Sequence, residues 1–171
     1  MAYRFEPLDK GRHDRKGFRC AVPALTNYLQ QQARKDAERN VAATFVMIDD
    51  AAPSRIIGYY TLSSFTVELT ELPEQLRNTL PLYPRLPATL IGRLARDEQC
   101  PGTGSLLLVD ALARAYGHKA TVASIAVVAE AKDDSALKFY RKHGFTQLGA
   151  EKNRVFLPME VIGRLIAVHK A

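Results

Sequence analysis

The chain has 171 residues, of which 47% are hydrophobic and 25% charged, and its net charge is +6. This composition is typical of a globular protein, and the length favours one domain over residues 1–171. Two cysteines exclude a disulfide scaffold, the four histidines are scattered singly so no metal site is expected, and no apolar run reaches the roughly 18–20 residues of a membrane span. Without a secretory signal, a cytoplasmic protein is expected.

The first half of the chain predicts a strand, a helix and a hairpin. Residues 3–8 alternate like a strand, and Pro23 begins a helix on which Leu25, Tyr28 and Leu29 are followed at helical spacing by Ala33 and Ala37. Strands over 43–48 and 56–63 flank a turn-like segment and are interpreted as a hairpin.

Strands and helices alternate in the second half. Prolines interrupt the segment around 71–84, and a strand over 88–96 leads through a glycine turn to a helix over 104–116. A buried strand over 121–129 and a helix over 133–142 follow, with Gly144 as a C-terminal cap. Phe145 and residues 155–157 are interpreted as closing strands and 161–168 as a helix. The order is that of an α/β domain without a linker.

The segment Gln99-Cys100-Pro101-Gly102-Thr103-Gly104 lies between that strand and helix. A helix N-terminus presents unpaired N–H groups, and glycines let an anion approach them closely. The pattern lacks the Lys-Ser/Thr pair of a Walker loop and the third glycine of a dinucleotide fingerprint. It predicts a phosphate-binding turn, with an ordinary loop as the alternative.

A second pattern spans residues 133–145. Asp133 or Asp134 can cap a helix whose apolar face carries Leu137, Phe139 and Tyr140. Together, Gln99-x-x-Gly102-x-Gly104 and Ala136-x-x-Phe139-Tyr140-x-x-x-Gly144-Phe145 resemble the two signatures of the GNAT N-acetyltransferases, in the family's order. The resemblance implies an α/β (α+β) GNAT fold, with a mixed, mostly antiparallel twisted sheet flanked by helices. It also implies acetyl-coenzyme A as co-substrate.

The resemblance assigns roles to particular residues. The coenzyme pyrophosphate would rest on the amides of Gly102, Thr103, Gly104 and Ser105. A backbone N–H from Leu94, Ala95 or Arg96 would stabilise the thioester oxygen. Lys138 and Phe139 would lie beside the coenzyme, and Arg96 and Lys138 are either phosphate contacts or surface charges. Tyr140 would act as general acid, protonating the departing thiolate.

A wider resemblance rests on four further segments, which are Phe18-Arg19-Cys20-Ala21-Val22-Pro23-Ala24-Leu25-x-x-Tyr28-Leu29, Gly58-Tyr59-Tyr60-Thr61-Leu62, Pro87-Ala88-Thr89-Leu90-Ile91-Gly92-Arg93-Leu94-Ala95 and Phe156-Leu157-Pro158-Met159. They are similar to the TacT/AtaT/KacT group, the acetyltransferase toxins of type II toxin–antitoxin modules. This implies acetylation of the α-amino group of aminoacyl-tRNA, which blocks translation. It also implies a ribbon-helix-helix antitoxin, contact with operator DNA only through that antitoxin, and a homodimer.

Basic residues are concentrated near the N-terminus, where residues 1–40 contain nine Lys/Arg and five Asp/Glu. Candidate tRNA contacts are Arg15, Lys16, Arg34, Lys35, Arg39 and Arg93, although a charged helix face is commonly just solvated. An α-amine has a reference pKa of about 7.7–8.0, so a strong base is unnecessary. Glu68, Glu71 and Glu130 are either bases or solvated carboxylates. Because neighbouring strand residues face opposite ways, one interpretation of Tyr59 and Tyr60 places one ring in the core and the other in an acceptor groove, and the core is favoured for at least one of them.

The turn departs from the toxin pattern. Relatives carry a more basic turn, such as Gln-Gly-Arg-Gly-x-Gly, whereas Cys100-Pro101 stands here and the stretch is about two residues shorter. Pro101 has no N–H, which predicts a cradle with fewer donors. Two alternatives therefore stay open: a GNAT enzyme acting on a small amine or a protein N-terminus, and a degenerate GNAT binding module.

Overall fold

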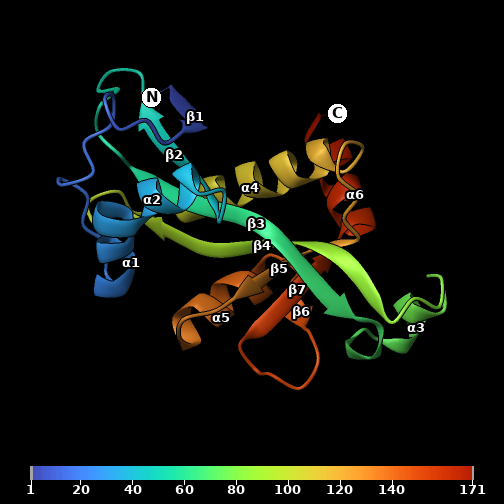
Figure 1. Cartoon of the computed structure of the whole chain (residues 1–171). Coiled ribbons are helices and arrows are strands. Elements are labelled where there is room, and N and C mark those ends of the chain that lie inside the picture. The colour runs from blue at the N-terminus through green and yellow to red at the C-terminus, as the bar shows by residue number, and fades with distance from the viewer. Residues whose placement is uncertain (1, 171) are drawn as a thin grey trace. The chain divides into compact units, whose positions relative to one another are not determined.

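The computed structural model describes residues 2–170, so Met1 and Ala171 lie outside it (Figure 1). Its seven strands have the order β1-β2-β3-β4-β5-β7-β6. Pairing is antiparallel for β1–β2, β2–β3, β5–β7 and β6–β7 and parallel for β4–β5, which confirms a mixed, mostly antiparallel sheet. The chain divides into two compact units, with Gly92–Ala111 joining the residues up to Ser63 in the first and Ser64–Ile91 joining those from Leu112 in the second.

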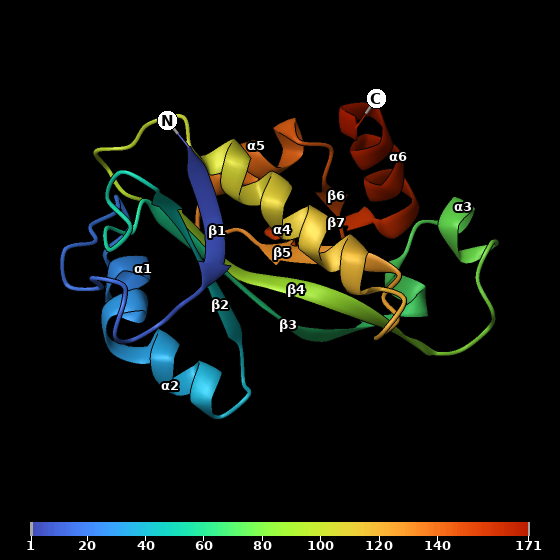
Figure 2. The same cartoon turned by 90° about the horizontal axis from the view of Figure 1, so that it is seen from above.

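The first unit begins with β1 and a short run of helix. Its elements are β1 (Tyr3–Pro7), α1 (Pro23–Asn27), a π-helical turn (Tyr28–Gln32), α2 (Ala33–Glu38), β2 (Ala43–Asp49), the first part of β3 (Gly58–Glu68), the end of β4 (Arg85–Arg96) and the start of α4 (Gly104–His118). Figure 2 shows α1 and α2 on the same side of β2. The π-helical turn was not expected from the spacing. It widens the helix by one residue, so the N–H of Ala33 reaches the carbonyl of Tyr28. Ala33 is buried, whereas Ala37 is exposed.

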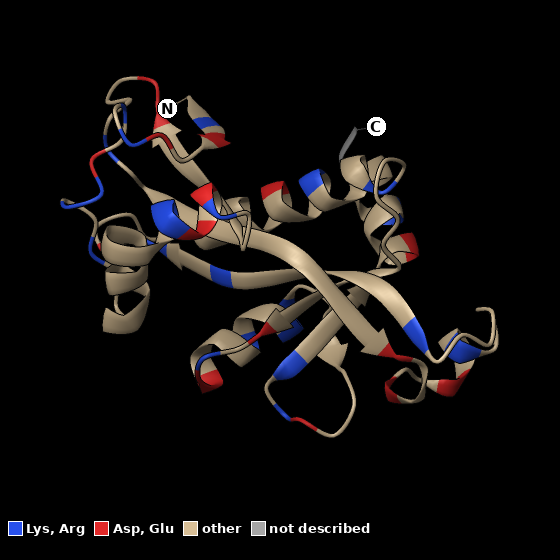
Figure 3. Cartoon of the chain, in the orientation of Figure 1, with Lys and Arg blue, Asp and Glu red and all other residues tan. Residues whose placement is uncertain are grey.

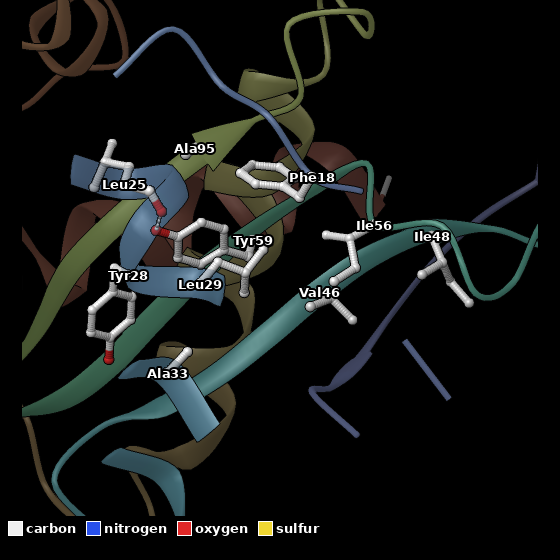
Figure 4. Packing of buried hydrophobic residues seen from close by; sticks show 10 residues of the cluster. All are labelled: Phe18, Leu25, Tyr28, Leu29, Ala33, Val46, Ile48, Ile56, Tyr59 and Ala95. Atoms are coloured by element: carbon white, nitrogen blue, oxygen red, sulfur yellow. Dashed lines mark hydrogen bonds between the residues drawn. The ribbon is translucent and has the colours of Figure 1, made fainter. Parts of the chain in front are cut away.

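An apolar cluster joins the helices to one face of β2 and β3 (Figure 4). Its members are Phe18, Leu25, Tyr28, Leu29, Ala33, Val46, Ile48, Ile56, Tyr59 and Ala95. Tyr59 donates a hydrogen bond from its hydroxyl to the carbonyl oxygen of Leu25 at 2.6 Å. A buried hydroxyl needs such a partner, so this bond fixes α1 on the sheet.

Tyr60 lies on the opposite face of β3, as strand alternation requires. Its ring is fully buried and stacks on Phe45, and its hydroxyl donates to Asp110 Oδ2 of α4 at 2.5 Å. The expectation that one of the two tyrosines enters an open groove is therefore wrong, because both rings are in the core. Helices thus contact both faces of β3 within this unit.

The second unit contains the remaining elements. They are a 3₁₀ turn (Leu69–Glu71), α3 (Glu74–Arg77), most of β4 (Arg85–Arg96), the end of α4 (Gly104–His118), β5 (Ala126–Glu130), α5 (Asp134–Lys142), β6 (Thr146–Gln147), β7 (Arg154–Pro158) and α6 (Met159–Lys170). Parallel pairing of Thr89 with Val127 places β5 beside β4. A parallel connection needs a crossover, and α4 supplies it. Buried apolar residues of β4, β5 and β7, including Leu86, Val128 and Phe156, form this unit's core with Leu148.

Several predicted boundaries move. The strand expected over 121–129 begins only at Ala126, because the amides of Thr121 and Val122 both donate to His118 and form the turn that ends α4. Phe145 is not in a strand, since its N–H donates to the Tyr140 carbonyl and closes α5. β3 extends five residues beyond its predicted end.

Candidate functional site

The glycine turn leaves β4 through Asp97, a buried carboxylate in the first unit. Its Oδ1 accepts the N–H of Gln99 at 2.9 Å, and its Oδ2 accepts the N–H of Arg19 at 3.2 Å. The bond to Gln99, two residues on, is an Asx turn. Backbone bonds from Asp97 N to Ile57 O (2.7 Å) and from Glu98 N to Arg19 O (2.8 Å) add further anchors. The start of the turn is therefore held by two other chain segments, one at Arg19 and one at Ile57.

The tip of the turn leads directly into α4. Gly102 has φ +83°, a conformation in which other residues are strained, and a Cβ at this position would have no atom within 4 Å. Thr103 is buried, its hydroxyl donates to the Cys100 carbonyl at 2.8 Å, and its own carbonyl accepts from Leu107 N at 3.1 Å. Helical bonding therefore starts here, followed by Gly104 and the exposed Ser105. The first turn of a helix has backbone N–H groups without partners inside the helix, and these groups can bind an anion.

The predicted residues of β4 border this turn. Leu94 is half-buried, and Ala95 belongs to the apolar cluster of the first unit. Arg96 is exposed, and its Nη1 donates to the backbone oxygen of Asp97 at 3.3 Å. Its guanidinium therefore lies at the base of the turn, as a phosphate contact would require.

Arg55 also reaches the turn, from the loop between β2 and β3. Its Nη2 lies 3.4 Å from Cys100 Sγ, 3.5 Å from Gln99 Oε1 and 3.9 Å from Asp97 Oδ1. The sequence analysis missed Arg55 because 44 residues separate it from Gln99, and no local pattern links them. It also missed Asp97, although an Asp two residues before a turn amide is a recognisable Asx signal.

The predicted acid, Tyr140, lies in the second unit on α5. Asp133 caps this helix, since its Oδ1 accepts from Ala136 N at 2.8 Å. The far end closes at His143, whose Nδ1 lies 2.8 Å from the Phe139 carbonyl oxygen, and Gly144 follows with φ +94°. Both ends are therefore terminated by the residues that the sequence indicated.

Aromatic rings surround Tyr140. Its ring centroid is 5.3 Å from that of Phe145 and 5.5 Å from that of Phe139, and only 5% of the residue is exposed. Burial raises the pKa of Tyr140 above its ordinary value of 10. The phenol therefore stays protonated at neutral pH. Phe139, expected in the core, is only half-buried and packs on His143 at 4.7 Å, while Lys138 is exposed.

The predicted tRNA contacts all lie in the first unit, and their surroundings differ. Arg34 pairs with Glu38 at 3.0 Å, and the Arg93 guanidinium covers the Tyr28 ring at 3.6 Å. The remaining members are less engaged: Lys16, Lys35 and Arg39 are exposed and Arg15 is half-buried. Figure 3 shows that acidic and basic residues are mixed along α2. Arg93 also lies near Asp36, which accepts from the Tyr28 hydroxyl at 2.7 Å.

The three carboxylates considered as bases have ion-pair partners. Glu68 lies 3.2 Å from Arg85, and Glu71 and Glu130 each lie 3.9 Å from Arg154. Glu68 and Glu71 also form a capping box around the 3₁₀ turn. These contacts give all three a structural role.

Within residues 2–170, no group of three or more His, Cys, Asp or Glu side chains is arranged to hold a metal ion. The described helices include none with the length and apolarity of a membrane span. The structure gathers Leu94–Arg96 and Gly102–Ser105 around one turn of the first unit, and it places Lys138–Tyr140 on one helix of the second.

No protein-family model matches the chain. A protein of Sinorhizobium fredii described as "Probable toxin TacT" is 32% identical over 171 residues, covering 94% of this chain and 93% of its own length. A "tRNA-acetylating toxin" of Mycobacterium tuberculosis is 32% identical over 129 residues, covering 74% of this chain and 75% of its own length.

Solved structures agree with this match. A tyrosine-to-phenylalanine mutant of KacT has a TM-score of 0.89 at 26% identity and covers 96% of this chain and 99% of its own. AtaT complexed with acetyl-methionyl-tRNAfMet has a TM-score of 0.88 at 25% identity, again with 96% and 99% coverage. AtaTR bound with AcCoA has a TM-score of 0.83 at 26% identity and covers 96% and 98%. The sequence motifs, the fold and these matches agree, and the chain belongs to the GNAT-type acetyltransferase toxins of type II toxin–antitoxin modules.

Proposed function

We propose that this chain uses acetyl-coenzyme A to acetylate the α-amino group of aminoacyl-tRNA and thereby blocks translation. The observation that carries the proposal is the turn 97–105, in which Gly102 at positive φ leads into the first amides of α4, in a chain that is 32% identical along 94% of its length to a protein described as a probable toxin. The M. tuberculosis relative is described as tRNA-acetylating, and AtaT was solved with an acetylated aminoacyl-tRNA.

The residues of the turn fit the phosphates of the acetyl donor. Gly102 leaves open space where a side chain would stand, and α4 presents the amides of its first turn from Gly104 and Ser105. In this proposal the pyrophosphate binds Gly102, Thr103, Gly104 and Ser105, with Arg96 beside it. The backbone of Leu94, Ala95 and Arg96 provides the donor for the thioester oxygen. Lys138 and Phe139 contact the rest of the coenzyme.

Tyr140 is the proposed general acid. The amine forms a C–N bond to the acetyl carbon, the C–S bond breaks, and the Tyr140 hydroxyl gives its proton to the departing sulfur. The proton lost by the amine restores the phenol through solvent. Burial raises the pKa of Tyr140, and apolar surroundings disfavour a thiolate as well. The apolar surroundings therefore disfavour the Tyr140 phenolate and the coenzyme thiolate alike. The difference between their two pKa values changes little, so the proton can still pass from the phenol to the sulfur.

The acceptor is proposed to bind the basic residues of the first unit. Lys16, Lys35 and Arg39 are the exposed members of this set and offer charge to the tRNA phosphates, with Arg15, Arg34 and Arg93 beside them in sequence or space. The reference pKa of an α-amine, about 7.7–8.0, leaves much of it neutral at cellular pH. A base is therefore not needed, which agrees with the ion-paired state of Glu68, Glu71 and Glu130.

The partners follow from family membership. We propose that both units form one acetyltransferase domain, since the S. fredii relative matches along 94% of the chain. The proposed partners are a ribbon-helix-helix antitoxin, operator DNA reached only through that antitoxin, and a second copy of the chain in a homodimer. The proposed location is the cytoplasm, where aminoacyl-tRNA is found.

Induction of wild type and Tyr140→Phe in a host without the antitoxin tests the proposal. Wild type should arrest growth and produce acetylated aminoacyl-tRNA, detected by mass spectrometry, while Tyr140→Phe should reduce acetylation by about 10²-fold or more. Tyr59→Phe is the matched control. It removes another buried tyrosine hydroxyl, one that donates to the Leu25 carbonyl oxygen and lies outside the proposed site, and should still arrest growth.

Equal growth of the wild-type and Tyr140→Phe strains would refute the toxin assignment. Acetylation of small amines or protein N-termini, with tRNA unmodified, would favour the other enzyme class. Absence of a thermal shift with acetyl-coenzyme A would favour a binding module, because a specific ligand stabilises the fold that it binds.

A further inference from the structure

The electrostatics of the turn pose a problem for an anionic ligand. Residues 97–104 contain no lysine or arginine, and they include two carboxylates, Asp97 and Glu98. Asp97 is buried and bonded to backbone amides, so its negative charge lies beside the place where a phosphate would bind. A positive charge from another part of the chain is needed to offset it.

Arg55 is the side chain that meets this need from outside the strand and turn. Its backbone is held at the Ser54–Arg55 peptide, since Arg55 N donates to Ala52 O at 3.1 Å and Ser54 O accepts from Asp14 N at 2.7 Å. The next residues are tied to the turn itself, through the 2.7 Å bond from Asp97 N to Ile57 O. The guanidinium therefore starts from a fixed point beside the turn.

The contacts of Arg55 leave most of its hydrogen-bonding capacity open. All three contacts, to Asp97, Gln99 and Cys100, use Nη2, and the two to oxygen are long, at 3.5 Å for Gln99 and 3.9 Å for Asp97. Among the described residues, none forms a hydrogen bond or ion pair with Nε or Nη1 of Arg55, and half of the side chain is exposed. A guanidinium has five N–H donors in a planar fork that matches two oxygens of a phosphate.

We infer that Arg55 binds a phosphate group of the acetyl donor, supplying the positive charge that the turn 97–104 lacks. This inference rests on the proposed function, since it assumes that the coenzyme occupies the turn. Arg55, near the Asp97 carboxylate, and Arg96, near the Asp97 backbone oxygen, then both contact the donor. The coenzyme carries a pyrophosphate and a 3′-phosphate, and either group can accept two parallel hydrogen bonds from the guanidinium.

Calorimetric titration of acetyl-coenzyme A into wild type, Arg55→Gln and Arg12→Gln tests the inference. Arg12 is the matched control, because its side chain is 55% exposed against 50% for Arg55 and also pairs with one carboxylate, Glu6. Arg55→Gln should bind about tenfold more weakly than wild type, the size expected for a charge-assisted bond, and Arg12→Gln should bind like wild type. Arg55→Lys, which keeps the charge without the fork, should fall between them.

Truncated donors separate phosphate binding from mere support of the turn. Against S-acetylpantetheine, which has neither phosphate group, Arg55→Gln and wild type should bind equally. With the 3′-dephospho donor, an unchanged tenfold gap assigns Arg55 to the pyrophosphate, and a vanished gap assigns it to the 3′-phosphate.

Equal affinity of wild type and Arg55→Gln for acetyl-coenzyme A would overturn the inference, as would an equal loss for S-acetylpantetheine. If wild type itself fails to bind acetyl-coenzyme A, the proposed function fails instead. Thermal melts identify a misfolded Arg55→Gln protein, and in that case the comparison of Arg55→Lys with wild type decides.

Discussion

Different kinds of interaction organise the glycine turn and the surroundings of Tyr140. Hydrogen bonds and charge organise the turn: Asp97 holds two backbone amides, and Arg55 and Arg96 lie beside it. Apolar burial organises the tyrosine, which packs between Phe139 and Phe145 with 5% of its surface exposed. Binding a phosphate requires hydrogen-bond donors in fixed positions. A general acid, the role proposed for Tyr140, requires surroundings that favour its protonated form.

This contrast predicts different effects on stability and ligand binding for an apolar substitution beside Tyr140 and for a polar substitution in the glycine turn. Phe145→Ala removes a buried ring beside Tyr140 and should destabilise the protein by about 3–5 kcal/mol. Chemical denaturation measures this change, and acetylation should fall because Tyr140 loses its support. Leu106→Ala, at a 44% exposed leucine of α4, is the control and should change stability by less than about 0.5 kcal/mol. Equal stabilities of the two variants would contradict the role given to Phe145.

Asp97 offers the corresponding test of the turn. Asp97→Ala leaves the amides of Arg19 and Gln99 without their acceptor and should destabilise the protein by about 2–3 kcal/mol. It should also weaken acetyl-coenzyme A binding in calorimetry. Asp133→Ala removes a cap from α5 at about 1 kcal/mol and should leave that binding unchanged. Loss of binding in both variants would show that the turn depends on global stability alone.

Substitutions at two glycines with positive φ allow the effect of backbone strain to be distinguished from an effect on ligand binding. Gly102→Ala and Gly144→Ala each place a side chain in a left-handed conformation without a steric clash, so each should destabilise by about 1–2 kcal/mol. Only Gly102→Ala should also weaken acetyl-coenzyme A binding, because its methyl group fills the space in which we propose that the phosphate binds. The melting temperatures and dissociation constants of the pair provide the measurement, and an equal effect on binding would remove Gly102 from the site.

The smallest expected effect is that of alkaline pH on Tyr140. Burial raises its pKa above 10, so the acid form is present at every lower pH and is lost only as the pH rises through the raised value. The rate should increase through about pH 8 as the acceptor amine loses its proton and then stay level to about pH 10. A pH–rate profile on aminoacyl-tRNA measures this, and a decline between pH 8 and 9 would contradict the assignment of Tyr140.

Sequence reasoning succeeded where one short segment carries the whole signal. The helix predicted over 133–142 is present as Asp134–Lys142, with its cap at Asp133 and with Gly144 at positive φ as expected, although Phe139 of its apolar face is only half-buried. It was less accurate where distant residues compete for a segment. Residues 121–125 were predicted as the start of a strand, yet the turn that ends α4 uses the amides of Thr121 and Val122. The π-helical turn over Tyr28–Gln32 likewise has no local signal.

The sequence by itself determined the fold class, the family and the candidate residues, because glycine spacing, caps and apolar periodicity are local properties of the chain. Only the tertiary structure decided that Tyr60 is buried against Asp110, that Asp97 organises the turn and that Arg55 reaches it. These contacts join residues far apart in sequence. Their formation depends on how strands and loops meet in space, which no local pattern records.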